Sequence, residues 1–145
     1  MKKKNTFVVI GNSAAGLSCL EAMREIDKDS RIINISREPY KRPYSRCLLS
    51  YYLAGAIGED RLWIRPENYY KDLNVEPMLK TEVLSVDEKN RKIKLSDKSV
   101  VEYDRLLCAA GASSKKLDIK GIDKKGTFYL RTLEDAEGII SMLKD

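Results

Sequence analysis

One N-terminal stretch carries the clearest pattern in the chain: Phe7-Val-Val-Ile-Gly-Asn-Ser-Ala-Ala-Gly-Leu-Ser18. An apolar run ends at Gly11, and Gly16 follows where a helical pattern begins. Gly11 can adopt a turn that a Cβ would obstruct, and Gly16 lets the helix pack close to its strand. Ser13 stands where the usual fingerprint has a middle glycine, so the motif is G-x-S-x-x-G. The stretch predicts a strand, a tight turn and a helix whose first N–H groups can bind a dinucleotide pyrophosphate.

The composition is that of an ordinary soluble protein. The 145 residues are 43% hydrophobic and 34% charged, and they suffice for one domain with its own core. No apolar run approaches the roughly 20 residues that span a bilayer. Three lysines follow Met1, but the apolar run after them is too short for a signal peptide. We therefore expect a cytoplasmic protein with no membrane partner.

The charge and the reactive residues exclude several classes of function. The net charge of +5 comes from scattered lysines and arginines, which indicates a solvated surface rather than a nucleic-acid interface. Three widely spaced cysteines indicate neither a disulfide framework nor a metal site, and Cys19 and Cys108 are expected in the core. The absence of histidine removes Ser-His and Cys-His nucleophile pairs. If the protein is an enzyme, a cofactor carries its chemistry.

The first 35 residues predict a β-α-β unit. Apolar patterning indicates a strand at Thr6–Ile10, a helix at Ala14–Asp27 and a strand at Arg31–Ile35. The buried face of the helix is expected to carry Leu17, Leu20, Met23 and Ile26. Glu38 lies just past the second strand, where a carboxylate usually holds a ribose hydroxyl. A plain exposed loop glutamate is the alternative.

The middle of the chain alternates loops, short helices and strands. One segment is rich in tyrosine and arginine, a composition that suits either phosphate contacts or a surface loop. It precedes a short helix expected at Leu48–Leu53, which Gly55 ends. A helix is expected at Glu67–Leu73 and a strand at Val75–Leu79. Three further strands predict a β-meander laid over the main sheet: Glu82–Val86, Lys92–Leu95 and Val100–Tyr103.

The last third predicts a second buried strand, a loop and a capped helix. The strand is Arg105–Gly111, and a short strand at Thr127–Leu130 follows a polar loop. Thr132–Asp135 is typical of a capping box, from which a helix should run to Leu143. The fold class is therefore α/β, with a parallel sheet, helices on one of its faces and a three-stranded β-meander on the other.

Four motifs occur in order across nearly the whole chain: Val9–Gly16, Tyr44–Ser50, Tyr103–Ala112 and Phe128–Ala136. Together they resemble the N-terminal FAD-binding part of the FAD-dependent pyridine nucleotide–disulfide oxidoreductase family. The branch they resemble most includes the flavin domain of NADH-dependent nitrite reductase, rubredoxin and ferredoxin reductases, and NADH oxidases. The resemblance implies a Rossmann-like FAD/NAD(P)-binding domain over residues 1–145.

The resemblance also implies a role for each matching position. The first glycine turn would hold the FAD pyrophosphate, Glu38 the adenosine ribose, and the backbone of Val83 the adenine. Arg46 would lie beside the flavin phosphates, and Arg131 matches an arginine before the helix cap. The implied FAD-binding residues are Gly11, Ser13, Ala14, Ala15, Gly16, Glu38, Arg46, Val83, Ala110, Gly111 and Arg131.

Cys47 has two interpretations. A redox-active cysteine follows a similar loop in coenzyme A disulfide reductases and some NADH oxidases, which makes Cys47 a candidate catalytic residue. The glycine that usually follows that cysteine is Leu48 here, and electron-carrier reductases often have proline at the cysteine position. Cys47 is therefore either redox-active or an unreactive replacement for proline.

The implied function is the FAD-binding domain of an NAD(P)H-dependent flavoprotein oxidoreductase. Electrons would pass from NADH through FAD to rubredoxin or ferredoxin, nitrite, oxygen or a disulfide. The NADH-binding and interface domains of the family are expected on a longer chain or a partner chain, so these 145 residues alone are expected to be inactive and to bind FAD weakly. The alternative is a non-catalytic dinucleotide-binding subunit or module that needs a partner chain.

Overall fold

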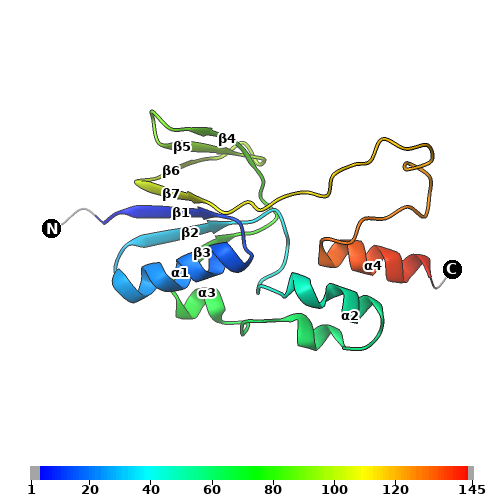
Figure 1. Cartoon of the computed structure of the whole chain (residues 1–145). Helices are drawn as coiled ribbons and strands as arrows, with labels where there is room; N and C mark the ends of the chain where they lie inside the picture. Colours follow the sequence, from blue (N-terminus) through cyan, green and yellow to red (C-terminus); the bar gives the residue numbers. More distant parts are fainter. Residues whose placement is uncertain (1–3, 144–145) are drawn as a thin grey trace. The chain divides into compact units, whose positions relative to one another are not determined.

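The computed structural model describes residues 4–143, which divide into two compact units. The first unit contains the residues up to Pro43 together with Arg65–Gly111. The second contains Tyr44–Ile64 and the residues from Ala112 onward. Figure 1 labels the helices and strands of both.

The first unit is built on a four-stranded parallel sheet in the order β3-β2-β1-β7. These strands are β1 (Thr6–Ile10), β2 (Arg31–Ile35), β3 (Val75–Met78) and β7 (Arg105–Cys108). β1 is flanked by β2 and β7, with Val8 opposite Ile33 on one side and Leu106 on the other. Because the strands are parallel, their carboxyl ends meet at one edge of the sheet, the edge at which such sheets bind ligands.

Helices cover one face of this sheet. α1 (Ala14–Ile26) and α3 (Tyr69–Asp72) pack against it, and Figure 1 shows α1 running along the strands with α3 close by. Their contact with the sheet is a buried apolar cluster made by Val9, Leu17, Leu20, Ile32, Tyr69, Tyr70 and Val75. The predicted β-α-β unit is thereby confirmed.

A three-stranded antiparallel meander covers the other face. It consists of β4 (Val83–Asp87), β5 (Lys92–Leu95) and β6 (Val100–Glu102), in that order. Ile93 and Leu95 of β5 are fully buried against Val8, Ile33 and Ile35 of the sheet. The alternation of outward lysines and inward apolar residues along β5 produces this contact. The predicted Rossmann-like α/β class is confirmed.

The second unit is helical. Short 3-10 turns, η1 (Arg46–Leu48) and η2 (Glu59–Leu62), flank α2 (Leu49–Leu53), which packs beside α4 (Leu133–Met142). Gly55 has a φ of +70°, the left-handed conformation that ends α2. Neither helix of this unit, nor any other helix among residues 4–143, is long and apolar enough to cross a membrane.

The predicted capping box of α4 is confirmed. The Asp135 N–H donates to Thr132 Oγ1 at 3.1 Å, and Asp135 Oδ2 accepts from the Thr132 N–H at 2.7 Å. These reciprocal bonds satisfy two N–H groups that a helix end leaves unpaired. Asp135 Oδ2 also accepts from the Arg131 N–H at 2.9 Å. Arg131, which precedes the N-cap residue Thr132, is thus fixed by the same carboxylate.

Three predictions about local structure were wrong. Ile26 is 88% exposed, because it follows Leu17 by about two and a half helical turns and so lies on the side of α1 opposite the buried face of Leu17, Leu20 and Arg24. Cys108 is exposed rather than buried in the core. Its strand, β7, lies at the edge of the sheet, where fewer neighbours cover it. Residues 127–130 form no strand, because no described segment pairs with them. The helix predicted around Glu67–Leu73 is confirmed as the shorter α3.

Candidate functional site

The carboxyl edge of β1 holds a tight turn that only glycine can make. Gly11 has a φ of +110°, and a Cβ on it would collide with the Ala109 carbonyl at the end of β7. A Cβ on Gly16 would collide with the Gly11 carbonyl. Gly11 N–H donates to the Ile35 carbonyl at 2.9 Å, so the turn is also bonded to the end of β2. Both glycines are therefore required by close backbone approach, as the sequence predicts.

The turn delivers the chain into α1 with its first N–H groups unpaired. The first hydrogen bond of the helix runs from the Leu17 N–H to the Ser13 carbonyl at 3.0 Å. No group among residues 4–143 accepts from the N–H groups of Ala14, Ala15 or Gly16, and the Ser13 side chain makes no capping bond. The first turn also contains no acidic residue. Unpaired N–H donors at the positive end of a helix dipole are the chemistry that suits an anion.

A buried asparagine supports the turn from β2, which the sequence pattern did not reveal. Asn34 is fully buried, and its Nδ2 donates to the Gly11 carbonyl at 3.0 Å and to the Val9 carbonyl at 3.2 Å. Its Oδ1 has no hydrogen-bond partner among the described residues. An amide in an otherwise apolar strand is the signal that could have identified it, because a buried polar side chain needs a bonding role.

Two other predicted residues lie near this edge of the sheet. Ala110 follows β7, and its nitrogen would lie 3.3 Å from a Cβ on Gly11. Gly111 comes next with a φ of +71°. The carboxyl ends of β1 and β7 are held together because the Ala109 N–H donates to the Ile10 carbonyl at 2.8 Å. The structure thus brings Gly11 and the Ala110-Gly111 turn together.

Glu38 and Val83 occupy the ends of neighbouring segments. The Glu38 N–H donates to Ser36 Oγ at 3.2 Å, and its carbonyl accepts from the Lys80 N–H at 3.2 Å. Its backbone is thereby fixed just beyond the carboxyl ends of β2 and β3, with the side chain half-buried. Val83 is the first residue of β4, pairs with Leu95 and packs partly buried against the meander core.

The remaining predicted residues lie in the second unit. Arg46 Nη1 donates to the Arg131 carbonyl at 2.9 Å and to the Tyr44 hydroxyl at 3.1 Å, and its guanidinium lies over the Tyr44 ring. The Tyr44 hydroxyl also accepts from the Leu133 N–H at 3.1 Å. Arg46 and Arg131 are therefore brought together at the N-terminus of α4. Cys47 is exposed next to Arg46 with a free thiol.

Electrostatics at the start of α4 involve one perturbed carboxyl. Burial raises the pKa of Asp135, but the hydrogen bonds from Thr132 and Arg131, and the charge of Arg46, outweigh it and lower the pKa below its usual value. Asp135 therefore stays ionised and holds the cap at neutral pH. Across residues 4–143, no cluster of cysteine and acidic side chains could hold a metal ion.

The chain belongs to the pyridine nucleotide-disulphide oxidoreductase family, whose model matches residues 5–145. It is 36% identical over 144 residues to an NADH oxidase of Methanocaldococcus jannaschii, covering 95% of this chain and 32% of that protein. It is 30% identical over 135 residues to the rubredoxin-NAD(+) reductase of Pseudomonas putida, covering 91% of this chain and 34% of that one.

Among solved structures, an NAD-dependent persulfide reductase from A. fulgidus is similar with a TM-score of 0.88 and 34% identity. The match covers 96% of this chain and 27% of that one. The chain spans at most about a third of the length of the two curated relatives described above. The likeness to these proteins therefore concerns one part of each.

Proposed function

We propose that this chain is the FAD-binding part of an NAD(P)H-dependent flavoprotein oxidoreductase. The observation that carries the proposal is the turn from Gly11 to Gly16, in which a Cβ at either glycine would strike backbone and the helix N–H groups lack acceptors. Such a cradle fits a pyrophosphate, which needs close backbone approach and several N–H donors. Family membership and the NAD- or NADH-linked names of the relatives support the same function.

Within the first unit, each candidate residue has a defined part in binding. The N–H groups of Ala14, Ala15 and Gly16 would donate to the pyrophosphate oxygens, and the Ser13 hydroxyl adds a further donor. Glu38, whose backbone is fixed at the edge of the sheet, would accept hydrogen bonds from the adenosine ribose. The backbone of Val83 would contact the adenine. Ala110 and Gly111 present backbone to the cofactor at the end of β7.

The roles of the second unit stay predictions. Arg46 and Arg131 are proposed to neutralise phosphate charge, and the bonds that tie Arg46 to Tyr44 and Arg131 hold its guanidinium in place. Guanidinium groups suit phosphate because they are always charged and donate from a planar fork. Cys47 is exposed and could react with a disulfide or persulfide, or could replace proline without reacting.

When bound, FAD supplies a ring that accepts hydride from a nicotinamide and releases electrons one or two at a time. The chain's residues would bind and orient the cofactor. The chain has no histidine, and none of the proposed roles requires a side chain to transfer a proton. The relatives' names point to different acceptors, so rubredoxin or ferredoxin, nitrite, oxygen and disulfides are all proposed as acceptor classes.

Reconstitution followed by reduction tests this function. The purified protein is incubated with FAD, freed of excess cofactor, and titrated with NADH without oxygen. A yellow protein that NADH bleaches supports the reductase. A yellow protein that NADH does not bleach even when the family's NADH-binding domain is supplied, on the same chain or a partner chain, supports the alternative, a dinucleotide-binding module without turnover. Flavin fluorescence that does not change as FAD is titrated with the protein contradicts FAD binding by this chain, provided that circular dichroism shows the protein folded.

A further inference from the structure

The second residue of the glycine turn is tied to a helix distant in sequence. The Tyr70 hydroxyl donates to Asn12 Oδ1 at 2.6 Å. Tyr70 is 5% exposed, and burial raises its pKa to about 12, although the bond to Asn12 acts in the opposite sense. The hydroxyl therefore keeps the proton that it donates throughout the neutral range. None of the proposed contacts to FAD uses this bond.

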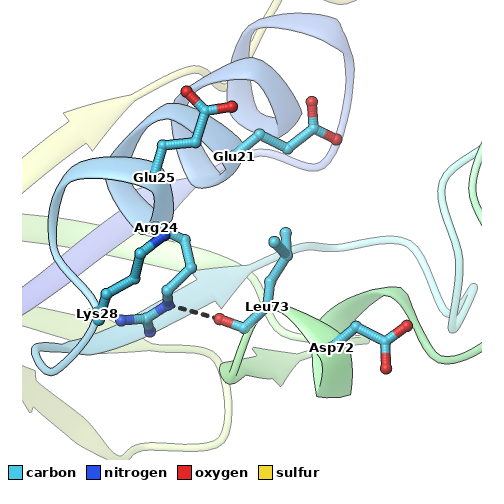
Figure 2. A pocket seen from close by; sticks show the side chains of 6 residues that line it. All are labelled: Glu21, Arg24, Glu25, Lys28, Asp72 and Leu73. Atoms are coloured by element: carbon cyan, nitrogen blue, oxygen red, sulfur yellow. Dashed lines mark hydrogen bonds between the residues drawn. The ribbon is translucent and has the colours of Figure 1, made fainter.

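The helix that carries Tyr70 is itself fixed to α1. α3 has four residues, too few to be stable without tertiary contacts. The buried guanidinium of Arg24 on α1 donates to the carbonyls of Leu73 at 2.6 Å and Asn74 at 2.8 Å, which follow α3. Figure 2 shows Arg24 reaching the Leu73 carbonyl across the seam between the two helices. Tyr70 is thus held at a set position relative to the start of α1.

The seam gains a second connection nearer the turn. Arg65, just before α3, pairs with Glu21 of α1 at 2.7 Å, and its guanidinium lies over the Tyr69 ring. From the opposite side, Asn34 of β2 donates to the Gly11 carbonyl. The turn is therefore restrained by α3 through the Asn12 side chain and by β2 through the Gly11 carbonyl. No described residue accepts from the N–H groups of Ala14, Ala15 or Gly16, so these restraints leave the proposed anion site open.

We propose that Tyr70 is a positioning residue: through Asn12 it holds the glycine turn in its binding conformation before the pyrophosphate arrives. The proposal rests on the proposed function, since it names the device that prepares that site. A turn ordered in advance loses less conformational entropy when the ligand binds, and so binds more tightly. A hydrogen bond of ordinary net strength predicts that Tyr70→Phe weakens FAD binding about three- to tenfold.

The adjacent tyrosine provides a matched control. Tyr69 lies on the same helix and is equally buried at 5% exposure, yet its hydroxyl interacts with Glu21 and Arg65 of the seam and not with the glycine turn. Tyr69→Phe therefore removes the same atom from the same helix without touching the turn. Burial and the neighbouring Glu21 charge raise the pKa of Tyr69, so this hydroxyl is also neutral.

The experiment combines FAD titration with amide hydrogen exchange on the ligand-free protein. Tyr70→Phe should raise the FAD Kd about three- to tenfold and speed exchange of the Gly11 and Leu17 amides, both of which are hydrogen-bonded at the turn. Tyr69→Phe should change neither. In an Asn12→Ala background, Tyr70→Phe should have no further effect on either measurement, because the acceptor is already gone.

Each outcome decides the proposal. If Tyr70→Phe leaves amide exchange at the turn unchanged, or if Tyr69→Phe changes it equally, Tyr70 does not position the turn. If exchange responds as expected but the FAD Kd does not change, the restraint does not serve cofactor binding and the proposal is overturned. If the wild-type protein binds no FAD, the proposed function fails, and faster exchange in Tyr70→Phe alone still shows that Tyr70 positions the turn.

Discussion

Replacing Arg24 by methionine should destabilise the first unit although it leaves the candidate site's own residues intact. Arg24 is 7% exposed and donates four hydrogen bonds to carbonyls, two following α3 and two at the end of α1. The two at the end of α1 go to Asp27 at 2.9 Å and Ser30 at 3.1 Å. A cation at the C-termini of two helices is also favoured by both helix dipoles.

The size of the effect follows from these contacts. A hydrogen bond to a charged group contributes about 1.5–3 kcal/mol. Asp27, Leu73 and Asn74 are partly or fully exposed, so their carbonyls can regain water when Arg24 is lost, whereas Ser30 is buried. Methionine keeps most of the apolar stem. We therefore expect Arg24→Met to lower the free energy of unfolding by about 2–4 kcal/mol, well below the sum of four separate bonds.

Urea denaturation followed by circular dichroism measures this loss. Lys28→Met is the matched control, because Lys28 follows the C-terminus of α1, lines the same hollow of about 350 Å³ as Arg24 and is exposed (Figure 2). It should change the free energy of unfolding by less than about 0.5 kcal/mol. An Arg24→Met protein as stable as the Lys28→Met protein would refute the view that Arg24 fixes α3 to α1.

Three further predictions concern the site and the second unit. Gly16→Ala should weaken FAD binding at least about tenfold in an absorbance titration, because its Cβ would collide with the Gly11 carbonyl; unchanged affinity would contradict the close approach. Asp135→Asn should cost about 1 kcal/mol at pH 7 in urea unfolding. Because its folded pKa is lowered, the wild-type contribution is present above the ordinary pKa near 3.9 and is lost as pH falls through the folded value, so the two proteins should converge in acid. In an enzyme that also carries the NADH-binding domain, Cys47→Ala should leave NADH-linked electron transfer intact in a steady-state assay, and complete loss of turnover would assign the thiol a redox role.

The central strands of the main sheet, β1 and β2, could be predicted because both are mostly apolar runs. β1 and β2 have the predicted bounds, since a parallel strand buried on both faces is apolar along its whole length. The capping box was equally local, because Thr132 and Asp135 satisfy each other within one turn. β7 has the same apolar composition but lies at an edge, and its sequence does not encode which neighbours cover it.

Contacts between distant segments account for what sequence patterns missed. Arg24 occupies a buried position of α1 because the carbonyls of the two residues after α3 accept its hydrogen bonds. Helical periodicity does not predict this contact. Asn34 and Tyr70 reach the glycine turn over 23 and 58 positions of sequence. The turn itself was predictable, because the backbone conformation of Gly11 and the close approach of Gly16 to the Gly11 carbonyl both require glycine. The side chains that hold it were not.

The central claim is that the first N–H groups of α1 bind the FAD pyrophosphate. Titrating the ¹⁵N-labelled protein with FAD, and separately with riboflavin, tests it by the amide signals of individual residues. The account predicts that the signals of Ala14, Ala15 and Gly16 shift with FAD and stay in place with riboflavin, which lacks the pyrophosphate. FAD binding that leaves these three signals unshifted would contradict it.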